Sequence, residues 1–548
     1  MMPSFTECLD ASWIDHAPAR DRSARGRAVA ATAHPLASWA ALTMLRQGGS
    51  AVDAAIAAQA VLTAVEPNAS GIGGGALMLV AGDAGVQAFE GLSGAPARVT
   101  DRLDRDFDGR IVPADRAAYG GRTVGVPGAL RALELAHRRH GRLAWKALFQ
   151  PAIELASEGY PLSAYLLRTL LENPSVQTEA MAWALFCGGG RTPLPAGTTL
   201  RNPALAATLA EIAEGGADAF YLGRTARDIC LAVAADPFPG VLTEADFAAY
   251  QAVERAPVRF ALGDMQVHGG GLPAFGAIAV GQVIGIAAAA GLGGIGAEPS
   301  ADAMHILAEA GRLAFADRAV YAGDPEFTRA DCQALLDPGY LQLRAGLIDM
   351  KRRKEGLLAG DVAMAASMTS HLSIADADGC VVSMTTTINN NFGGRISVGG
   401  FYLNNVMTNF ASRPLATGTL SVNAMARHKR PRTSIAPCIV CDAAGRPVAA
   451  VGAGGGSRII GYVANALMRL AQGLRDPQEI LSSPHVLNFA GITEIEPPLD
   501  RHAADLVARG HWVIPRRFDG GTQMAIRSAD GWHAGGDPRR DGIGLGLK

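Results

Sequence analysis

The sequence has almost no excess of either charge. It contains 49 Lys and Arg against 51 Asp and Glu, which gives a formal net charge of −2. This balance does not draw a protein towards nucleic acid or an anionic membrane surface, so neither is expected as a partner. A small-molecule amide or a peptide is the better expectation.

The start of the chain lacks the apolar core of a secretion signal. Residues 1–27 form a polar leader that includes Asp10, Asp15 and Arg20. The seven Cys are odd in number and scattered, which fits reduced thiols better than a disulfide framework. The sequence therefore predicts a cytoplasmic protein.

No stretch has the composition of a membrane span. Residues 276–297 are uncharged and long enough, but they are mostly Ala and Gly, which gain little from lipid. We predict a helix buried inside the protein over 277–290, followed by a glycine-rich turn.

Several catalytic signatures are also missing. The glycine-rich runs 71–75, 188–190 and 452–456 lack the Gly-Lys-Ser/Thr ending of a phosphate-binding loop. Neither His-Glu-x-x-His nor Gly-x-Ser-x-Gly occurs. Cys438 and Cys441 form a lone pair, which leaves a structural zinc site two ligands short. The sequence therefore predicts no metal, no cofactor and no Ser-His-Asp triad.

What remains describes a large folded protein of 548 residues, of which 49% are hydrophobic. Apolar residues at helical spacing predict two helices within 37–65, broken at Gly48 and Gly49, and further helices within 128–235 and 301–320. A strand is predicted over 76–80. Short β-type runs then follow one another, and they lie at 372–374, 380–388, 399–403, 434–441 and 448–451. In this interpretation the first two-thirds is largely helical and a sheet begins near residue 370.

The most informative segment runs from Met368 through Thr369, Ser370 and His371 to Ser373. Taken alone it is a polar turn that enters a hairpin. It resembles the self-processing site of the γ-glutamyltranspeptidase family, N-terminal-nucleophile hydrolases that cut themselves before a threonine. Other runs resemble the family's and keep its order from about residue 28 to the C-terminus; they include 48–55, 71–75, 124–128, 316–318, 403–405, 429–431, 455–458, 521–523 and 537–539.

The resemblance implies an α+β fold, the four-layer αββα sandwich of the N-terminal-nucleophile hydrolases. It also implies autoprocessing between Met368 and Thr369, which yields a large piece, 28–368 behind the leader, and a small catalytic piece, 369–548. The two pieces would associate as a heterodimer and form one folded unit. A periplasmic location stays open by analogy with the family.

Roles for individual residues also follow from the resemblance. Thr369 matches the nucleophile, whose freed α-amino group, with a pKa near ~8, serves as its own general base. Thr387 matches the hydroxyl that orients the nucleophile, and Gly455 and Gly456 match the pair whose N–H groups stabilise the oxyanion. The residues that match substrate-binding positions are Asn389, Asn409, Thr433 and Ser434.

Two departures from the family bear on the substrate. The arginine that binds glutamate is missing from the corresponding stretch, 92–96. Asn409 replaces the aspartate that pairs with the substrate α-ammonium, and Val406 replaces a neighbouring glutamine or glutamate. An asparagine cannot offer the charge-assisted hydrogen bond of a carboxylate.

Three hypotheses about function remain open. The first is hydrolysis, or transfer to an amine, of γ-glutamyl amides such as glutathione; it is favoured narrowly because 404–405, 433–434 and 455–456 keep the transpeptidase form. The second is an amidohydrolase or acylase with another acyl group, similar to the oxamate amidohydrolases and cephalosporin acylases. The third is an inert binding protein on the same fold, against which the intact Thr369 and Thr387 argue.

Overall fold

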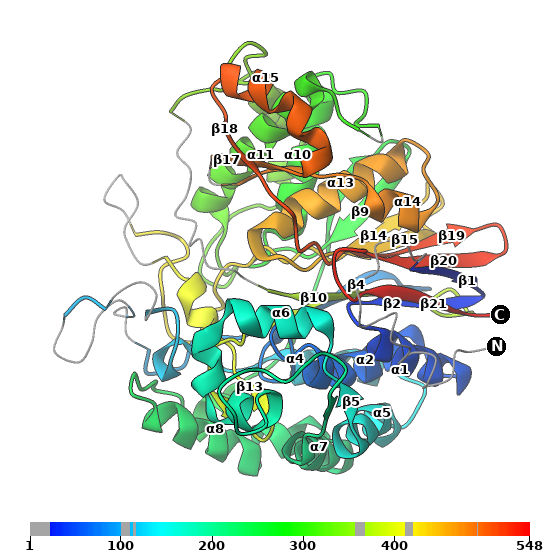
Figure 1. Ribbon diagram of the computed structural model, residues 1–548. Helices are drawn as coiled ribbons and strands as arrows, with labels where there is room; N and C mark the ends of the chain where they lie inside the picture. Colours follow the sequence, from blue (N-terminus) through cyan, green and yellow to red (C-terminus); the bar gives the residue numbers. More distant parts are fainter. Residues whose placement is uncertain are drawn as a thin grey trace.

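The computed structural model describes residues 22–99, 103, 110–112, 117–296, 298–356, 368–411, 420–489 and 491–548. Two β-sheets lie face to face between two layers of helices (Figure 1). This arrangement confirms the α+β, four-layer αββα sandwich. Residues 1–21 of the expected leader lie outside the described residues, whereas Ser23–Gly26 form an edge strand.

One seven-stranded sheet contains the segment that follows Thr369. Every pairing in it is antiparallel. Across the sheet its strands are β21 (Ile543–Leu547), β2 (Ala28–Thr32), β10 (Ser370–Ala375), β11 (Val381–Thr387), β3 (Gly75–Gly82), β4 (Gly85–Gly91) and β7 (Val253–Arg255). Strand β10 therefore lies in the interior of this sheet, where Ser370 pairs with Thr386.

The second seven-stranded sheet is also antiparallel throughout. Its strands are, in order, β1 (Ser23–Gly26), β20 (Gly531–Gly536), β19 (Gln523–Ser528), β15 (Pro447–Gly452), β14 (Cys438–Cys441), β9 (Met265–Gly269) and β8 (Val258–Leu262). Strands β15 and β19 pack against β10 of the first sheet. The loop that follows β15 is thereby brought to the start of β10.

Smaller strand groups lie outside the two large sheets. They are β16 (Val486–Phe489) with β17 (Ile492–Ile495) and β18 (Trp512–Pro515), β12 (Ser397–Val398) with β13 (Phe401–Tyr402), and β5 (Tyr160–Pro161) with β6 (Thr199–Leu200).

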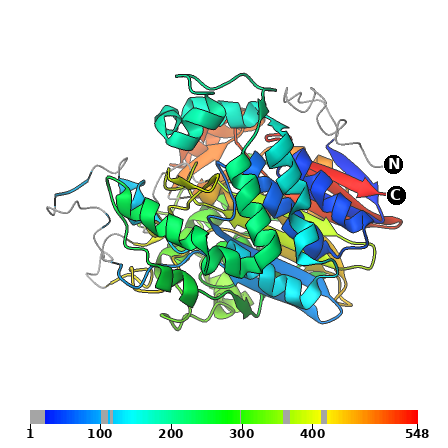
Figure 2. The ribbon, with the colours of Figure 1, turned by 90° about the horizontal axis from the view of Figure 1, so that it is seen from below.

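Helices cover the outer face of each large sheet. Those on the side of the first sheet, in front of the strands in Figure 2, are α1 (Pro35–Arg46), α2 (Ala51–Val65), α4 (Ala129–His140), α5 (Trp145–Glu158), α6 (Ala164–Glu172), α7 (Pro203–Tyr221), α8 (Arg224–Ala235) and α9 (Glu244–Ala249). Those on the other side are α10 (Gly276–Ala289), α11 (Ala301–Tyr321), α12 (Pro338–Ala345), α13 (Ile459–Ala471), α14 (Pro477–Ser482) and α15 (Ala503–Ala508). Among the described residues no helix is both long and apolar enough to span a bilayer.

Two hydrophobic cores hold the layers together. Along β3, Met78 and Val80 face the α1–α2 layer, whereas Leu77 and Leu79 face the second sheet, as the two-residue period of a strand requires. Helix α2 begins with a capping box in which Ser50 and Asp53 bind each other's backbone N–H. It runs directly beneath β10 and β11 and ends at the loop that carries Glu66.

The helices predicted within 37–65 and over 277–290 are confirmed by α1, α2 and α10. The prediction that the sheet begins near residue 370 is wrong, because β2, β3 and β4 flank β10 and β11. Strand β2 reads Ala-Val-Ala-Ala-Thr, and alanine gives little β signal of its own. The strand predicted over 434–441 is shorter, Cys438–Cys441.

Candidate active site

The peptide bond between Met368 and Thr369 is enclosed at the start of β10. Thr369 is 2% exposed and Met368 is 9% exposed. The Met368 side chain packs with Ala69 and Tyr165. The backbone N–H of Met368 donates to the carbonyl oxygen of Asn389 at 2.8 Å. Both sides of the bond are therefore fixed by packing and by backbone hydrogen bonding.

Thr387, the last residue of β11, links the side chain of Thr369 to this peptide bond. The Thr369 hydroxyl donates to Thr387 Oγ1 at 3.3 Å, and Thr387 Oγ1 donates to the carbonyl oxygen of Met368 at 3.0 Å. The N–H of Asn389 also donates to Thr387 Oγ1, at 2.8 Å. Because a hydroxyl has one proton and two lone pairs, these contacts direct the Thr387 proton onto the Met368 carbonyl.

A glycine loop after β15 approaches Thr369 from the second sheet. A Cβ on Gly454 would lie 1.9 Å from the Thr369 carbonyl oxygen, so only glycine fits there. Gly455 and Gly456 follow with φ values of 123° and 61°, in the region that favours glycine. Among the described residues, neither glycine N–H is bonded to an acceptor, so both are available to an incoming oxyanion.

Asn389 is held rigidly beside Thr387. Its backbone has a φ of 79°, which is uncommon for a residue with a side chain. Its Nδ2 donates to Asn405 Oδ1 at 3.0 Å and to Thr408 Oγ1 at 3.1 Å. Asn404, in turn, donates from Nδ2 to the carbonyl oxygen of Gly73 at 2.9 Å. The Asn404–Asn405 pair thus supports the walls of the site.

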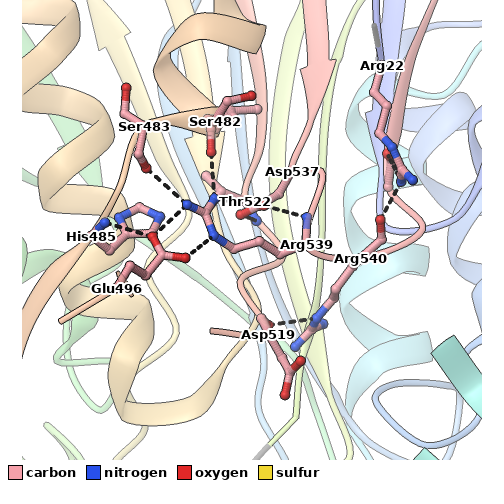
Figure 3. A network of polar contacts seen from close by, with 12 residues as sticks. Arg22, Ser482, Ser483, His485, Glu496, Asp519, Thr522, Asp537, Arg539 and Arg540 are labelled. Atoms are coloured by element: carbon pink, nitrogen blue, oxygen red, sulfur yellow. Dashed lines mark hydrogen bonds and ion pairs between the residues drawn. The ribbon is translucent and has the colours of Figure 1, made fainter. Parts of the chain in front are cut away.

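Two consecutive arginines in the loop before β21, Arg539 and Arg540, turn their side chains towards different partners (Figure 3). Arg539 forms ion pairs with Glu496 at 2.7 Å and Asp537 at 3.1 Å, and it donates to the carbonyl oxygen of Ser483. Arg540 donates from Nε to the carbonyl oxygen of Asp519 at 2.9 Å. The Nη1 of Arg540 donates to the carbonyl oxygen of Thr369, also at 2.9 Å.

A buried carboxyl group lies on the other side of β10. Ser370 donates to Glu66 Oε2 at 2.6 Å, and Ser70 lies 2.8 Å from Ser370 through the two hydroxyl oxygens. Burial raises the pKa of Glu66 to about 7, although Arg540 and the hydrogen bond from Ser370 act in the opposite direction. Glu66 is therefore poised to change protonation near neutral pH.

His371, in β10, is held between two hydroxyl groups. The ring is fully buried. Its Nδ1 is hydrogen-bonded to Thr385 Oγ1 at 2.8 Å, and its Nε2 is hydrogen-bonded to Ser373 Oγ at 3.1 Å. Burial lowers the pKa of His371 to about 3, so the ring is neutral at physiological pH. Gly452 packs against the ring, where a Cβ would lie 2.3 Å from it.

A pocket opens beside Thr387 and Asn389. It is lined by Gly75, Leu92, Ser93, Thr387, Ile388, Asn389, Asn404, Val406, Asn409, Pro431 and Thr433. None of these described lining residues has an ionisable side chain. The pocket can therefore hold apolar groups and hydrogen-bonding groups, but these residues supply no oppositely charged partner for an ammonium or a carboxylate.

The structure brings some of the expected site residues together at the pocket. Thr387, Asn389, Asn409 and Thr433 line the pocket. Thr369, Gly455, Gly456 and Ser434 do not line it; Thr369 and Ser434 are buried, at 2% and 7% exposed. No group of three or more His, Cys, Asp or Glu side chains in the described ranges is arranged to hold a metal ion.

Three residues at the site were missed by the sequence analysis: Glu66, Tyr165 and Arg540. Glu66 and Tyr165 have no local pattern that marks them, because they reach Ser370 and Met368 only through the fold. Arg540 had a weak signal, since it directly follows the family-like run 537–539.

Comparisons with known proteins agree with this architecture. A family profile described as Gamma-glutamyltranspeptidase matches residues 37–547. The chain is 34% identical over 536 residues to the Acylase ACY 1 proenzyme of Pseudomonas sp. (strain SE83), with 93% of each protein covered. It is also 34% identical over 459 residues to the Glutathione hydrolase proenzyme of Bacillus subtilis (strain 168), covering 80% of this chain and 76% of that protein.

A solved structure is similar over nearly the whole chain. The crystal structure of cephalosporin acylase from Bacillus halodurans has a TM-score of 0.82 and 27% identity, and the match covers 96% of this chain and 97% of that one.

Proposed function

Because the chain belongs to the gamma-glutamyltranspeptidase family, we propose that it is a proenzyme that cuts itself between Met368 and Thr369 and then hydrolyses small amides through Thr369. One observation carries the proposal. The hydroxyl of Thr369 is connected through Thr387 to the carbonyl oxygen of Met368. A donor on that oxygen makes the carbonyl carbon more electrophilic, and the same chain of hydroxyls can accept the proton of the nucleophile.

Self-cleavage proceeds by an acyl shift from nitrogen to oxygen. Oγ1 of Thr369 bonds to the carbonyl carbon of Met368 and passes its proton to Thr387, which gives its own proton to the carbonyl oxygen. The tetrahedral intermediate collapses as the proton of its hydroxyl group passes to the nitrogen, the bond from carbon to nitrogen breaks, and the nitrogen leaves as the neutral α-amine. Water then opens the ester, which yields a Met368 carboxyl group and restores the Thr369 hydroxyl.

The cleaved enzyme uses Thr369 again. Its new α-amino group, with an ordinary pKa near ~8, takes the hydroxyl proton as the oxygen attacks a substrate amide. The free N–H groups of Gly455 and Gly456 receive the oxyanion, a contribution of roughly 3 to 4 kcal/mol per donor. Water releases the acyl group, or an amine does so in a transfer reaction.

Access requires a rearrangement after cleavage. Thr369 is 2% exposed, and Met368 packs with Ala69 and Tyr165. We infer that Met368 leaves this apolar cluster once it carries a carboxylate, because an ionised group is costly to bury there. Once Met368 has left, Thr369 is accessible from the pocket beside Thr387.

The two pieces stay together as a heterodimer. Strands β2 and β3 of the large piece pair with β10 and β11 of the small piece. Cutting the chain at residue 368 breaks none of these backbone hydrogen bonds and exposes neither core. We therefore expect the fragments to separate only when the protein unfolds.

The described lining residues, none of which is ionisable, favour a non-glutamyl acyl group over the γ-glutamyl group that the sequence analysis favoured narrowly. A γ-glutamyl group carries an α-ammonium and an α-carboxylate, and burying either without an oppositely charged partner is costly. Leu92 and Asn409 are among the uncharged lining residues, at or beside positions where the family has an arginine and an aspartate. We propose an amidase of the acylase type, with γ-glutamyl amides as the second candidate.

The test is a panel of anilides that differ only in the acyl group. Uncharged acyl-anilides, oxamate amides and γ-glutamyl-anilide are compared with purified wild-type protein and with Thr369→Ala. We expect the highest kcat/KM for an uncharged acyl group and no turnover by Thr369→Ala. If the wild-type protein is completely cleaved after residue 368 but hydrolyses none of these amides, the hypothesis of an inert binding protein is supported.

A further inference from the structure

Arg540 contacts both residues of the bond that is proposed to break. Its Nη1 donates to the carbonyl oxygen of Thr369 at 2.9 Å, and its Nη2 lies 3.2 Å from Sδ of Met368. The side chain is completely buried, and its Nε is fixed by the carbonyl oxygen of Asp519, as Figure 3 shows. Within the described ranges no carboxylate lies close enough to form an ion pair with it.

A buried guanidinium without an ion pair is unusual, because removing a charge from water is costly. Here three contacts hold it: two backbone carbonyls and a sulfur. Tyr165 also packs on the guanidinium, 5.3 Å from its ring centre. Two glycines make room for the side chain, since a Cβ on Gly454 or Gly521 would lie 2.7 or 2.9 Å from Nη1. The surroundings are therefore shaped to place one positive charge beside Thr369.

The other titratable groups near this charge come from several elements. Those that act on Arg540 or on Glu66 are Tyr165 of α6, Tyr462 of α13, and Asp519 and Asp541 in the loops on either side of β19 and β20. His371 in β10 is neutral. Glu66 is the group whose charge changes near pH 7, and it reaches β10 through Ser370.

We propose that Arg540 is a positioning residue that fixes Thr369 for self-cleavage and, in the cleaved enzyme, uses its charge to keep the new α-amino group neutral. This inference rests on the function proposed above. An amine with a pKa near ~8 is mostly protonated at pH 7 and cannot act as a base. A cation close by disfavours the ammonium form and lowers that pKa by about one unit or more.

Glu66 opposes the effect of Arg540 on the new α-amino group. Once ionised, it offsets part of the field of Arg540 at the amine, so the amine regains protons more readily. Arg540 and Glu66 should therefore move the acidic limb of the pH profile in opposite directions. A residue that only maintained the fold would lower the rate without producing this pair of shifts.

The experiment compares four variants: Arg540→Met, Arg540→Lys, Glu66→Gln and, as a matched control, Arg469→Met. Arg469 is another fully buried arginine, in α13, and its guanidinium donates to the backbone carbonyl oxygens of Asn465 and Pro484. Self-cleavage is followed on denaturing gels, and kcat/KM of the cleaved enzyme is measured from pH 5 to pH 9 with the best anilide.

Arg540→Met should cleave roughly 10- to 100-fold more slowly, and its acidic limb should lie about one pH unit higher. Arg540→Lys should also cleave slowly but keep the limb near that of the wild type, because the charge is retained. Glu66→Gln should move the limb to lower pH. Arg469→Met should lower the melting temperature without moving the limb.

Normal cleavage of Arg540→Met together with an unmoved limb overturns the proposal. An Arg540→Met protein that stays uncleaved while as thermally stable as Arg469→Met supports the positioning role. If Arg540→Met does not fold or does not cleave, Glu66→Gln decides the charge role, and an unmoved limb in that variant refutes it. Failure of the wild-type chain to cleave would instead refute the proposed function, so the two failures are distinguishable.

Discussion

Thr387 Oγ1 donates a hydrogen bond to the carbonyl oxygen of Met368 at 3.0 Å while it accepts one from the hydroxyl of Thr369 at 3.3 Å. The proposed nucleophile and the carbonyl group that it would attack first are thus joined through one side chain. The N–H of Asn389 occupies the second lone pair of Thr387. The hydrogen bonds that the proposed self-cleavage requires are consequently present in the uncut chain.

Removing this hydroxyl should slow maturation. Thr387→Val keeps the shape of the side chain but deletes all three hydrogen bonds of the hydroxyl, so we expect cleavage to slow by about 100- to 1000-fold, a loss of about 3 to 4 kcal/mol. The intact chain is followed over time by mass spectrometry. Thr387→Ser restores the hydroxyl and should recover most of the rate. A Val variant that matures at the wild-type rate would exclude Thr387 from the reaction.

The glycine loop should tolerate no side chain at its closest approach. Gly454→Ala places a Cβ 1.9 Å from the Thr369 carbonyl oxygen, so either Thr369 or the loop has to move. We expect loss of self-cleavage and a lower melting temperature. Gly82→Ala is the control, because its Cβ meets no atom within 4 Å. Equal cleavage in the two variants would contradict the described approach of the two sheets.

The effects expected of Thr387→Val and Gly454→Ala depend on contacts that could be predicted from the sequence only in part. The pair of helices around residue 48 and the helix over 277–290 were predictable, because alanine-rich segments of helical period and glycine breaks act locally. The pairing of β2 with β10 and of β3 with β11 was not, since it joins segments about 300 or more residues apart and leaves no local mark. Thr387 and Gly455 were found through the family resemblance, not through periodicity.

The same distinction applies to the buried network around Thr369. Glu66 and Ser370 lie 304 positions apart in the chain, so no spacing rule connects them. Arg540 lies next to a recognisable run, but nothing in the sequence says that it turns towards Thr369 while Arg539 turns towards Glu496. Burial, which sets the charge states here, is a property of the complete fold.

Glu66 should make stability depend on pH. Its folded-state pKa, about 7, lies above the ordinary value of 4.5, so the folded state binds more protons between these values. Its contribution is therefore favourable below pH 4.5 and is lost as pH rises through 7, a change of up to roughly 3 kcal/mol. The test is urea unfolding at pH 5 and pH 8 of Thr369→Ala and of the double variant Thr369→Ala/Glu66→Gln. The free energy of unfolding should fall less between pH 5 and pH 8 in the double variant. An identical loss in both proteins would exclude this role.

A carboxylate in the pocket should shift the acyl preference. Asn409→Asp introduces a charge among uncharged lining residues, and it can pair with the α-ammonium of a γ-glutamyl group. We expect the ratio of kcat/KM for γ-glutamyl-anilide to that for an uncharged acyl-anilide to rise at least about tenfold. Asn173→Asp, at the end of α6, adds the same charge away from the pocket and should leave the ratio unchanged. An unchanged ratio in Asn409→Asp would mean that Asn409 does not face the acyl group.

The central claim is that the amine and the hydroxyl of one residue become the catalyst when the chain is cut. The most direct measurement is the intact mass and the N-terminal sequence of the active protein, beside its hydrolytic rate, as the precursor matures. The account predicts two fragments, a small one that begins at Thr369, and activity that rises in proportion to that fragment and is absent from Thr369→Ala. Full activity in a chain that remains joined at residues 368 and 369 would contradict it.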